Sequence, residues 1–339
     1  MPLQRHADIR SMNTFGVSAK AEYVGRFNDA EELRALLAMP ELQGIPRMIL
    51  GGGSNVLFTR DFPGALLLNE VMGMKVVRED DSHVWVKAGA GVGWHELVLN
   101  AVAQGWGGIE NLSLIPGKVG AAPMQNIGAY GVEIKDTFDT LEALRIDDGS
   151  VVIFDREACL FGYRESFFKR LGREQYVILN VTFRLTKAPH ALNTSYGNIS
   201  DELVRMGISS PTIKDVSDAV IAIRRSKLPD PAVTGNAGSF FKNPVVAVEV
   251  AERIKQEHPD MPAYPAGEGM VKLAAGWLIE KAGWKGYRAN GYGVHDRQAL
   301  VLVNHGGATG NEIFTLSGEI IESIKERFGV ELEREVNIV

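Results

Sequence analysis

The stretch IPGKVGAAPMQNIGAYG, residues 115–131, decides the fold class, because its composition is typical of neither a helix nor a strand. Four glycines, three alanines and two prolines leave almost no side-chain bulk, so the segment cannot build a hydrophobic core by itself. Ordered loops of this length are usually functional. We therefore expect a large flat ligand to lie against this backbone, with Gln125 and Asn126 bonding to its polar edges.

Two shorter glycine runs precede this segment, and each follows a predicted strand. LGGGSN (50–55) can present consecutive backbone N–H groups to a phosphate, although as a bare pattern it is equally well a tight turn. It has neither the lysine of a P-loop nor the GxGxxG spacing of a Rossmann turn. GAGVG (89–93) does not match the Rossmann spacing either, because Trp94 and Glu96 stand where its third glycine is needed. The sequence therefore does not predict a classical dinucleotide-binding sheet.

The composition limits the class of protein further. The 339 residues exceed one compact core and predict two or three domains. With 36 basic and 42 acidic residues, the net charge of −6 argues against a nucleic-acid or anionic membrane surface. The segment MPLQRHADIRSMNTFG has no apolar signal region, and no apolar run approaches the roughly 20 residues of a membrane span. We therefore expect a soluble, cytoplasmic protein.

Cysteine and histidine give no metal motif. Cys159 is the single cysteine, which excludes an internal disulfide and a thiol-rich metal site. The seven histidines are scattered, and WHELVL (94–99) has Leu99 where HExxH needs its second histidine. We therefore expect no bound metal, and we expect His95 to be a histidine on a helix surface.

The predicted elements are mixed. A capping box at Asn28–Glu31 opens a short helix, and the DDGS turn (147–150) predicts a β-hairpin within a strand-rich region over about 140–187. The chain changes character beyond Lys187, where helices dominate, so we place a boundary near 190–210. Further predicted elements are the strands IPRMIL, HVWVKAGA, YVILNVTFRL, ALVLVN and VELEREVNIV, and the helices GWHELVLNAVAQ, PTIKDVSDAVIAIRRSKL, 244–258, 269–283 and 310–328.

Three short motifs carry side chains suited to an anionic ligand. Arg164 in FGYRESFFK (161–169) either caps aromatic faces or holds a carboxylate or phosphate. Tyr196 stands in the turn-forming stretch NTSYGN. The cations of RRSKLPDP (224–231) either complement a helix C-terminus or bind a diphosphate or carboxylate. The sequence by itself leaves these alternatives open.

The stretch TGNAGSFFKNP (234–244) raises the question of a nucleophilic serine at Ser239. A nucleophile elbow needs very small residues two places either side of the serine, and Phe241 occupies the downstream place. No neighbouring histidine supplies a base. The local sequence therefore argues against a serine hydrolase.

Taken in order, seven motifs resemble those of the UDP-N-acetylenolpyruvoylglucosamine reductases, flavoenzymes of peptidoglycan precursor synthesis. The resemblance covers nearly the whole chain, and residues 262–292, with Tyr264, are similar to the longer, type I branch of that family. The seven motifs are NTFG (13–16), GGGSNVL (51–57), IPGKVGAAPMQNIGAYG (115–131), YRES (163–166), RRSKLPDP (224–231), GNAGSFFKNP (235–244) and LEREV (332–336).

The resemblance implies an α+β protein with a non-Rossmann FAD-binding α/β region of the PCMH/VAO type. That region would cover residues 1–200, with subdomains at about 1–66 and 67–200. A smaller α/β substrate-binding domain would cover 201–339, and its last strand would carry a catalytic glutamate. The FAD is expected to be non-covalent, because the glycine loop lacks the histidine that binds flavin covalently in some relatives. The implied FAD-binding residues are Gly51, Gly52, Gly53, Ser54, Asn55, Ile115, Pro116, Gly117, Gly120, Ala121, Gln125, Asn126, Gly128, Ala129, Tyr130, Gly131 and Arg224.

The reaction that the resemblance implies is reduction of UDP-N-acetylglucosamine enolpyruvate to UDP-N-acetylmuramate, with NADPH as co-substrate. Hydride from flavin N5 goes to the enol ether, and the carbanion equivalent needs charge stabilisation and a proton. Ser239 is implied as the proton donor, and Arg164 and Glu335 as the groups that steady the enolpyruvyl carboxylate. The implied substrate contacts are Tyr196, Lys227, Asn243, Tyr264 and Gln298. One position departs from the pattern, since Asn337 stands where some members have arginine.

Two other functions remain possible on the motifs alone. One is another PCMH-fold flavin oxidase or dehydrogenase, and the other is a flavin-free nucleotide-sugar binding protein. The reductase reading carries further expectations: a monomer with no nucleic-acid or membrane partner, and a role in cell-wall biogenesis and hence in cell shape and division.

Overall fold

The structure is a computed structural model that describes residues 3–339, and its chain divides into two compact units. Unit 1 contains the described residues up to Ala7, Ala21–Gly52 and Pro63–Ser226. Unit 2 contains Asp8–Lys20, Gly53–Phe62 and Lys227–Val339. These two units are groups of residues that pack compactly together. The division predicted near residue 200 separates an FAD-binding region from a substrate-binding domain, and it stays a prediction.

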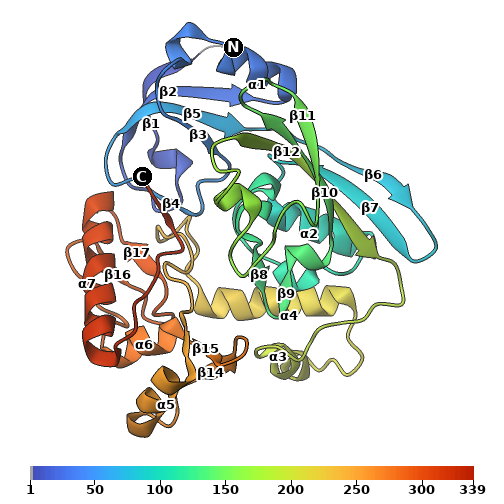
Figure 1. Cartoon of the computed structure of the whole chain (residues 1–339). Helices are drawn as coiled ribbons and strands as arrows, with labels where there is room; N and C mark the ends of the chain where they lie inside the picture. The colour runs from blue at the N-terminus through green and yellow to red at the C-terminus, as the bar shows by residue number, and fades with distance from the viewer. Residues whose placement is uncertain (1–2) are drawn as a thin grey trace. The chain divides into compact units, whose positions relative to one another are not determined.

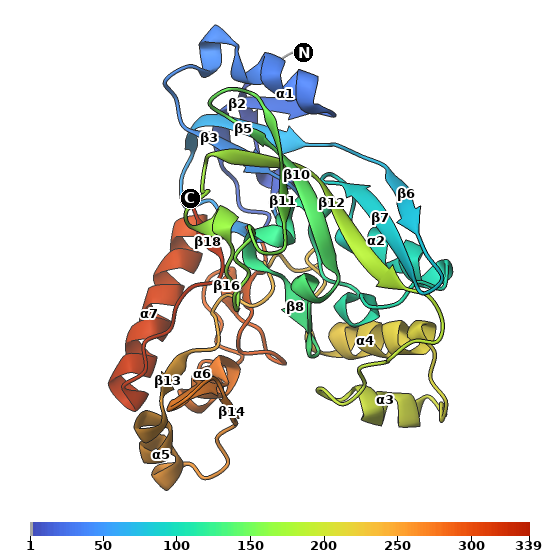
Figure 2. The same cartoon turned by 45° about the vertical axis from the view of Figure 1, so that its right-hand side comes forward.

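Unit 1 is organised around a five-stranded antiparallel sheet, which is followed in Figures 1 and 2. The predicted hairpin around the DDGS turn is confirmed, because Leu144 pairs with Val151 and Thr140 with Asp155. In spatial order the strands are β11 (Val151–Asp155), β10 (Phe138–Arg145), β12 (Tyr176–Thr186), β7 (His83–Gly89) and β6 (Met74–Glu79).

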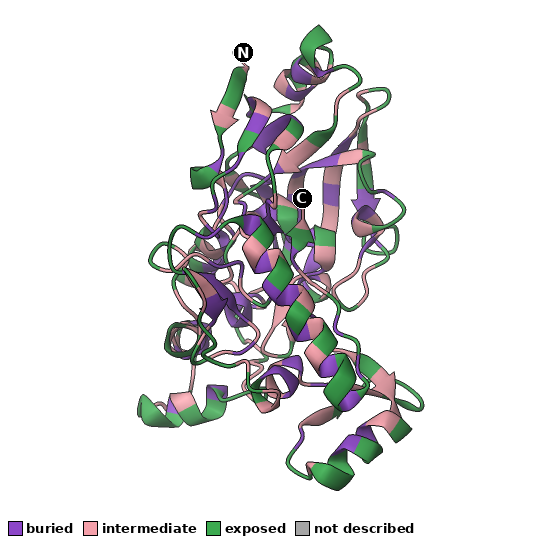
Figure 3. Cartoon of the chain, turned by 90° about the vertical axis from the view of Figure 1, so that its left-hand side faces the viewer, coloured by how far each residue is buried: buried purple, intermediate pink, exposed green. Residues whose placement is uncertain are grey.

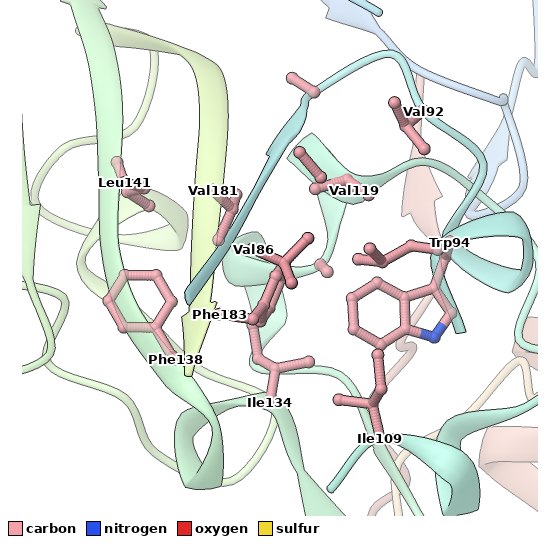
Figure 4. Packing of buried hydrophobic residues seen from close by; sticks show 14 of the residues in the cluster. Val86, Val92, Trp94, Ile109, Val119, Ile134, Phe138, Leu141, Val181 and Phe183 are labelled. Atoms are coloured by element: carbon pink, nitrogen blue, oxygen red, sulfur yellow. The ribbon is translucent and has the colours of Figure 1, made fainter. Parts of the chain in front are cut away.

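Helix α2 (Trp94–Ala103) and this sheet share one hydrophobic core. Figure 4 shows Trp94 of the helix beside Phe183 of β12, and their ring centroids are 5.6 Å apart in an edge-to-face arrangement. The indole Nε1 of Trp94 donates to the carbonyl of Leu112 at 3.0 Å, so its polar atom is satisfied although the residue is buried. Truncation of such a side chain to alanine costs about 3–5 kcal/mol, which makes Trp94 a principal anchor of unit 1.

The second sheet of unit 1 lies at the N-terminal side of the chain, in the order β1 (Gln4–Asp8), β2 (Lys20–Phe27), β5 (Phe62–Asn69), β3 (Arg47–Leu50). Helix α1 (Ala30–Leu37) packs its Leu33 and Leu36 into the core beside this sheet. The capping pair is one residue later than predicted. The carboxylate of Asp29 accepts the N–H of Glu32, and Glu32 accepts the N–H of Asn28, each at 2.8 Å.

The glycine-rich segment 115–131 is irregular, as predicted, and contains only short 3₁₀ turns and a two-stranded hairpin. The hairpin pairs β8 (Gly128–Ala129) with β9 (Val132–Glu133). Helices α3 (Ile199–Arg205) and α4 (Ile213–Lys227) form a separate small core, with Tyr130 packed against it. Shorter 3₁₀ turns lie at Arg10–Met12, Pro40–Leu42, Glu110–Leu112, Val119–Ala121, Pro123–Gln125, Ile134–Asp136 and Phe167–Lys169.

Unit 2 combines three helices with three small sheets. The helices predicted over 244–258 and 269–283 are wrong at their starts, because each begins with a strand, and these two strands pair with each other. The strand predicted for VELEREVNIV is regular only at its end, where it pairs with β4 in parallel. The elements are β4 (Val56–Leu57), β13 (Val245–Ala247), α5 (Val248–Glu257), β14 (Ala263–Pro265), β15 (Met270–Leu273), α6 (Ala275–Lys281), β16 (Tyr292–Val294), β17 (Leu302–Asn304), α7 (Gly310–Phe328) and β18 (Asn337–Ile338).

Helix α7 (Gly310–Phe328) has the bounds that the sequence predicted. Thr309 and Glu312 form a reciprocal capping box at its start, and Gly329 ends it in the left-handed region with φ +66°. Buried and exposed positions alternate along it with helical spacing, as the bands in Figure 3 show. Within residues 3–339, no helix of the protein is both long and apolar enough to cross a bilayer.

Candidate active site

The first two glycines of the GGGSN loop lie against the start of the 115–131 segment, within unit 1. A Cβ on Gly52 would stand 3.3 Å from the Cα of Gly117, and one on Gly51 would stand 3.3 Å from the Cβ of Lys118. Gly117 has φ +107°, a conformation that side chains rarely adopt. Two backbones therefore approach each other with little between them, as a phosphate-binding cradle requires.

Gly120 is needed for a second close approach. Its N–H donates to the carbonyl of Ala90 at 2.9 Å, and a Cβ there would lie 2.5 Å from the Cβ of Ala90. Val119 likewise donates to Val92 at 2.9 Å, so residues 117–120 run along the GAGVG loop. Pro116 and Ala121 remain exposed, which leaves small apolar groups of this segment open to a flat ligand.

Asn126 organises the middle of the segment from the inside. It is buried with φ +44°, and its Nδ2 donates to Glu133 and to the Gly162 carbonyl, both at 3.0 Å. Its Oδ1 accepts the N–H of Lys135 at 3.2 Å. Because Asn126 is fully buried and its side chain is engaged within the protein, its amide holds the segment in place, and the structure does not present that amide to a ligand as expected.

Two arginines of unit 1 bond to backbone carbonyls in or directly before the 115–131 segment. The Nη2 of Arg164 donates to the carbonyl of Gly128 at 2.8 Å, and its guanidinium also lies 5.7 Å from the ring of Tyr163. The Nε of Arg224 donates to the carbonyl of Leu114 at 3.2 Å. Arg224 is therefore turned toward the segment, while the next residue, Arg225, is exposed at the end of the helix.

The charges of this cluster influence one another. Burial lowers the pKa of Arg224, the phenol of Tyr130 opposes that effect, and the charge of Arg164 adds to it. Burial raises the pKa of Tyr130, and the charge of Arg224 works against the rise. Two guanidinium groups beside a partly buried phenol make this part of unit 1 electropositive, so it favours an anionic or electron-rich ligand.

Tyr196 lies next to Tyr130, so a predicted substrate contact and a predicted flavin contact share one locality. A Cβ on Gly197 would stand 3.4 Å from the ring of Tyr130, and one on Gly131 would stand 3.0 Å from the Cβ of Tyr196. Tyr196 is 51% exposed, so its ring is available to a ligand.

A residue that the sequence did not single out joins these two loops. Asn111 is buried, and its Nδ2 donates to the carbonyl of Tyr130 at 3.0 Å and to that of Asn193 at 2.8 Å. Both acceptors are backbone atoms, so no residue type at their positions signals the contact. Its place directly before the glycine-rich segment was the one available hint.

In unit 2, Ser239 opens a short extended segment that lies between two others. Phe240 donates its N–H to Leu300 at 2.7 Å, and its carbonyl accepts the N–H of Glu335 at 2.8 Å. Lys242 donates to the carbonyl of Glu333 at 2.9 Å. Ser239 is exposed and follows Gly238, which has φ +70°. The backbone ladder thus fixes Ser239 and Glu335 on adjacent segments, with Phe240 buried as the anchor.

The other predicted substrate residues of unit 2 fall into two groups. Asn243 and Gln298 both lie at the start of α6: Asn243 accepts the N–H of Ala275 at 3.0 Å, and a Cβ on Gly276 would stand 3.2 Å from Oε1 of Gln298. Tyr264 on β14 and Lys227 at the end of α4 are exposed. The structure therefore brings Asn243 and Gln298 together at the start of one helix.

The second half of the GGGSN loop ties three motifs together in unit 2. Gly53 has φ +60°, and a Cβ there would lie 2.0 Å from the carbonyl of Met12, so only glycine fits. Its own carbonyl accepts the N–H of Thr14, in NTFG, at 3.0 Å. Asn55 donates its Nδ2 to the carbonyl of Glu335, in LEREV, at 3.3 Å. Ser54, between them, is half-buried.

These features fit FAD. The crowded glycines form a cradle that any Cβ would fill, and exposed small residues follow it. The arginine pair supplies positive charge on the same segment. Residues 51–55 contain no histidine for a covalent flavin bond. Among residues 3–339, no group of three or more histidine, cysteine, aspartate or glutamate side chains is arranged to hold a metal ion.

Comparison with known proteins gives matches to both regions of the chain. The family described as "FAD binding domain" matches residues 21–155, and the family described as "UDP-N-acetylenolpyruvoylglucosamine reductase, C-terminal domain" matches residues 230–339. Two proteins named UDP-N-acetylenolpyruvoylglucosamine reductase are similar over almost their whole length. The one from Pseudomonas aeruginosa is 50% identical, covering 100% of this chain and 99% of that protein. The one from Chromobacterium violaceum is 51% identical, covering 99% of each.

A solved structure gives the fold independently. The crystal structure of UDP-N-acetylenolpyruvylglucosamine reductase from Thermus caldophilus superposes with a TM-score of 0.67 at 23% identity, covering 100% of this chain and 99% of that one. The predicted fold class, an α+β protein with a non-Rossmann FAD-binding region, is thereby confirmed.

Proposed function

We propose that this chain, which belongs to the UDP-N-acetylenolpyruvoylglucosamine reductase family, uses FAD and NADPH to reduce UDP-N-acetylglucosamine enolpyruvate to UDP-N-acetylmuramate. The observation that carries this proposal is identity at half of all positions along the full length of named reductases. The glycine cradle and the arginine pair of unit 1 support it with a site whose chemistry suits a flavin nucleotide.

The FAD is held mainly by backbone groups. Backbone groups of Gly51 to Asn55 would hold the diphosphate, residues of the 115–131 segment would hold the ring system, and Arg224 would supply positive charge to the flavin. When bound, FAD would supply the chemistry of hydride transfer between NADPH and the enolpyruvyl double bond.

The side chains of the protein then stabilise the negative charge that develops on the substrate and donate a proton to it. Arg164 and Glu335 orient and polarise the enolpyruvyl carboxylate, which bears the negative charge that develops on hydride addition. The hydroxyl of Ser239 donates its proton to the adjacent carbon, and a cation such as Lys227 steadies the serine oxygen afterwards. Tyr196, Asn243, Tyr264 and Gln298 hold the nucleotide sugar. Support for these roles comes from the motif positions and from the ladder that ties Ser239 to Glu335.

The cellular setting follows from the same proposal. A single buried cysteine is compatible with a reducing compartment, and we assign the enzyme to the cytoplasm as a monomer without nucleic-acid or membrane partners. Its product would feed cell-wall biogenesis, on which cell shape and division depend. Cell fractionation and size-exclusion chromatography with light scattering test these two statements.

Stopped-flow spectroscopy of the two half-reactions tests the function. NADPH should bleach the flavin absorption of purified holoprotein, and the enolpyruvyl sugar should restore it without peroxide. Rapid NADPH oxidation with peroxide and no dependence on the sugar would identify a flavin oxidase instead. A colourless protein that does not take up FAD would identify a nucleotide-sugar binding protein.

A further inference from the structure

His95 occupies a position between a helix and the flavin segment that the proposed chemistry does not use. It lies in the first turn of α2 (Trp94–Ala103), on a helix as expected, and it is half-buried. Its Nδ1 lies 2.9 Å from the backbone nitrogen of Leu114, which donates its N–H to the ring. The acceptor is the imidazole itself, so Nδ1 carries no proton and the ring is the neutral Nε2–H tautomer.

Leu114 needs this partner because of its backbone. It has φ +58°, in the left-handed region that a branched side chain occupies only at a cost. The residue directly precedes Ile115, where the flavin segment begins. A hydrogen bond to the N–H of Leu114 therefore fixes the direction in which that segment leaves the core.

The carbonyl group of the same residue is bound to an arginine. The carbonyl of Leu114 accepts the Nε–H of Arg224 at 3.2 Å, and the preceding residue, Ser113, lies 2.8 Å from the hydroxyl of Ser217. Since Ser113 already donates its hydrogen to the carbonyl of Glu110 at 2.6 Å, Ser217 is the donor of that second bond. Leu114 is thus held by α2 through its N–H and by α4 through its carbonyl.

We propose that His95 is a positioning residue for the flavin site: its neutral ring holds Leu114 in the left-handed conformation and thereby sets the place of Arg224. This inference rests on the proposed function only in identifying FAD as the ligand that this segment receives. All the contacts lie within unit 1.

The charges around His95 keep the ring neutral. Burial lowers the pKa of His95, and the charges of Arg225 and Arg224 on α4 lower it further. Glu96 on its own helix and Glu110, whose carboxylate accepts the N–H of Gly108, are the acidic neighbours along the chain. Protonation would place an N–H on Nδ1 opposite the N–H of Leu114 and a third cation beside two arginines, which breaks the contact.

Two substitutions at this position separate the acceptor from the ring. In His95→Asn the Oδ1, attached to Cγ as Nδ1 is, can still accept the N–H of Leu114 but cannot be protonated at these pH values. In His95→Phe the ring volume is retained and the acceptor is lost. His83→Asn, which changes a histidine on β7 of the same unit that bonds to Ser82 and Arg184, is the matched control.

The affinity of the apoproteins for FAD and the absorption spectrum of the bound flavin are measured from about pH 8 to about pH 5. We expect His95→Phe to bind FAD about tenfold more weakly with an altered spectrum, because a buried donor loses its partner. His95→Asn should bind within about threefold of wild type, and its affinity should not fall on acidification, whereas that of wild type and His83→Asn should. His95→Phe binding like wild type, or His95→Asn binding as weakly as His95→Phe, would overturn the proposal.

A measurement on the unsubstituted apoprotein keeps the test independent of folding in the variants. In ¹⁵N-histidine NMR spectra, with His95 assigned from the missing signals of His95→Asn, the ring should be the Nε2–H tautomer and stay neutral below about pH 6.5. An Nδ1–H tautomer would contradict the proposal. These results are separable from those on function: a protein that binds FAD as described but does not reduce the sugar refutes the proposed function and leaves the role of His95 standing.

Discussion

The side-chain amide of Asn55 donates a hydrogen bond to the backbone carbonyl of Glu335 at 3.3 Å, across a sequence separation of 280 residues. In return, Asn337 donates both its backbone N–H and its Nδ2 to the carbonyl of Asn55, at 3.2 and 2.9 Å. The glycine loop therefore holds the segment that carries the proposed catalytic glutamate, both at Glu335 itself and two residues beyond it.

Asn55→Ala should disturb catalysis more than stability. Loss of one hydrogen bond costs about 1 kcal/mol, or roughly a 2 °C fall in Tm for a chain of this size, while the carbonyl of Asn55 keeps its partners. We expect flavin reduction by NADPH to be nearly unchanged and reoxidation by the sugar to slow several-fold. Asn337→Ala is the matched control: it removes a bond to the same residue without touching Glu335, so it should lower Tm alike and leave both half-reactions alone. Equal kinetic effects of the two changes would contradict this reading.

Ser239→Ala should affect one half-reaction only. General-acid catalysis contributes typically 10²–10⁴-fold, so reoxidation of the reduced flavin by the sugar should slow by about that factor while reduction by NADPH is retained. Rapid-mixing kinetics measure both. Ser209→Ala, on an exposed loop of α3's C-terminal side, should change neither rate. If Ser239→Ala slowed both steps equally, the serine would not be the specific proton donor.

Gly120→Ala should weaken FAD binding. The added methyl would stand 2.5 Å from the Cβ of Ala90, so the two backbones must separate and the cradle must widen. We expect at least a tenfold loss of FAD affinity, measured by titration of the apoprotein.

Gly318→Ala, the same chemical change at another position, should stabilise the protein. It lies inside α7 with 3.6 Å to the nearest atom, so helix propensity should raise the unfolding free energy by about 0.5–1 kcal/mol.

Substitution of Asn126 should lower the unfolding free energy, and alanine should lower it more than glycine. Both changes leave Glu133, the Gly162 carbonyl and the Lys135 N–H without this partner, which costs about 2–4 kcal/mol in unfolding free energy. Alanine adds strain, because φ at this residue is +44°. Denaturant unfolding should therefore place Asn126→Ala about 1 kcal/mol below Asn126→Gly. The reverse order would show that backbone conformation is not limiting here.

Cys159 should be inert in the native protein. Burial, assisted by the charge of Asp155, raises the pKa of its thiol from 9.0 to about 12. A thiol reagent should therefore label one equivalent in denaturant and none in the folded protein at about pH 8. The raised folded pKa means that this group's contribution to stability is complete below the unfolded pKa and is lost as pH rises from about 9 toward about 12. Rapid labelling of the folded state would contradict the burial.

Sequence patterns predicted those parts of the molecule where a residue type or spacing is typical of a single kind of structure. The helix predicted over 310–328 has those bounds in the structure, and the run of small residues at 115–131 indicated a backbone laid against a ligand. The short strands β13 and β15 were read as helix because three or four residues give no usable periodicity, and only their mutual pairing defines them.

His95 and Asn111 escaped prediction for a different reason. The side chain of each residue forms a hydrogen bond with a backbone atom that is distant in the sequence. His95 and Leu114 are 19 residues apart, and Asn111 and Asn193 are 82 residues apart. A peptide group has no residue type, so a sequence carries no sign of such a backbone partner, whether it donates as Leu114 does or accepts as Asn193 does. The roles given to Ser239 and Glu335 came from the motif match, and they remain to be tested by the experiments above.

The division of the chain into interleaved stretches has a consequence for biosynthesis. Residues 8–20 and 53–62 leave the ribosome long before Lys227, yet they belong to the same compact unit as everything after it. At about 5–20 residues per second, some ten to thirty seconds separate Phe62 from Lys227. Strand β4 must wait longer still, because its partner β18 ends at Ile338. Unit 1 has nearly all of its chain by then, so it can fold during translation, whereas unit 2 is necessarily assembled last and is the part that a nascent-chain chaperone has most reason to shield.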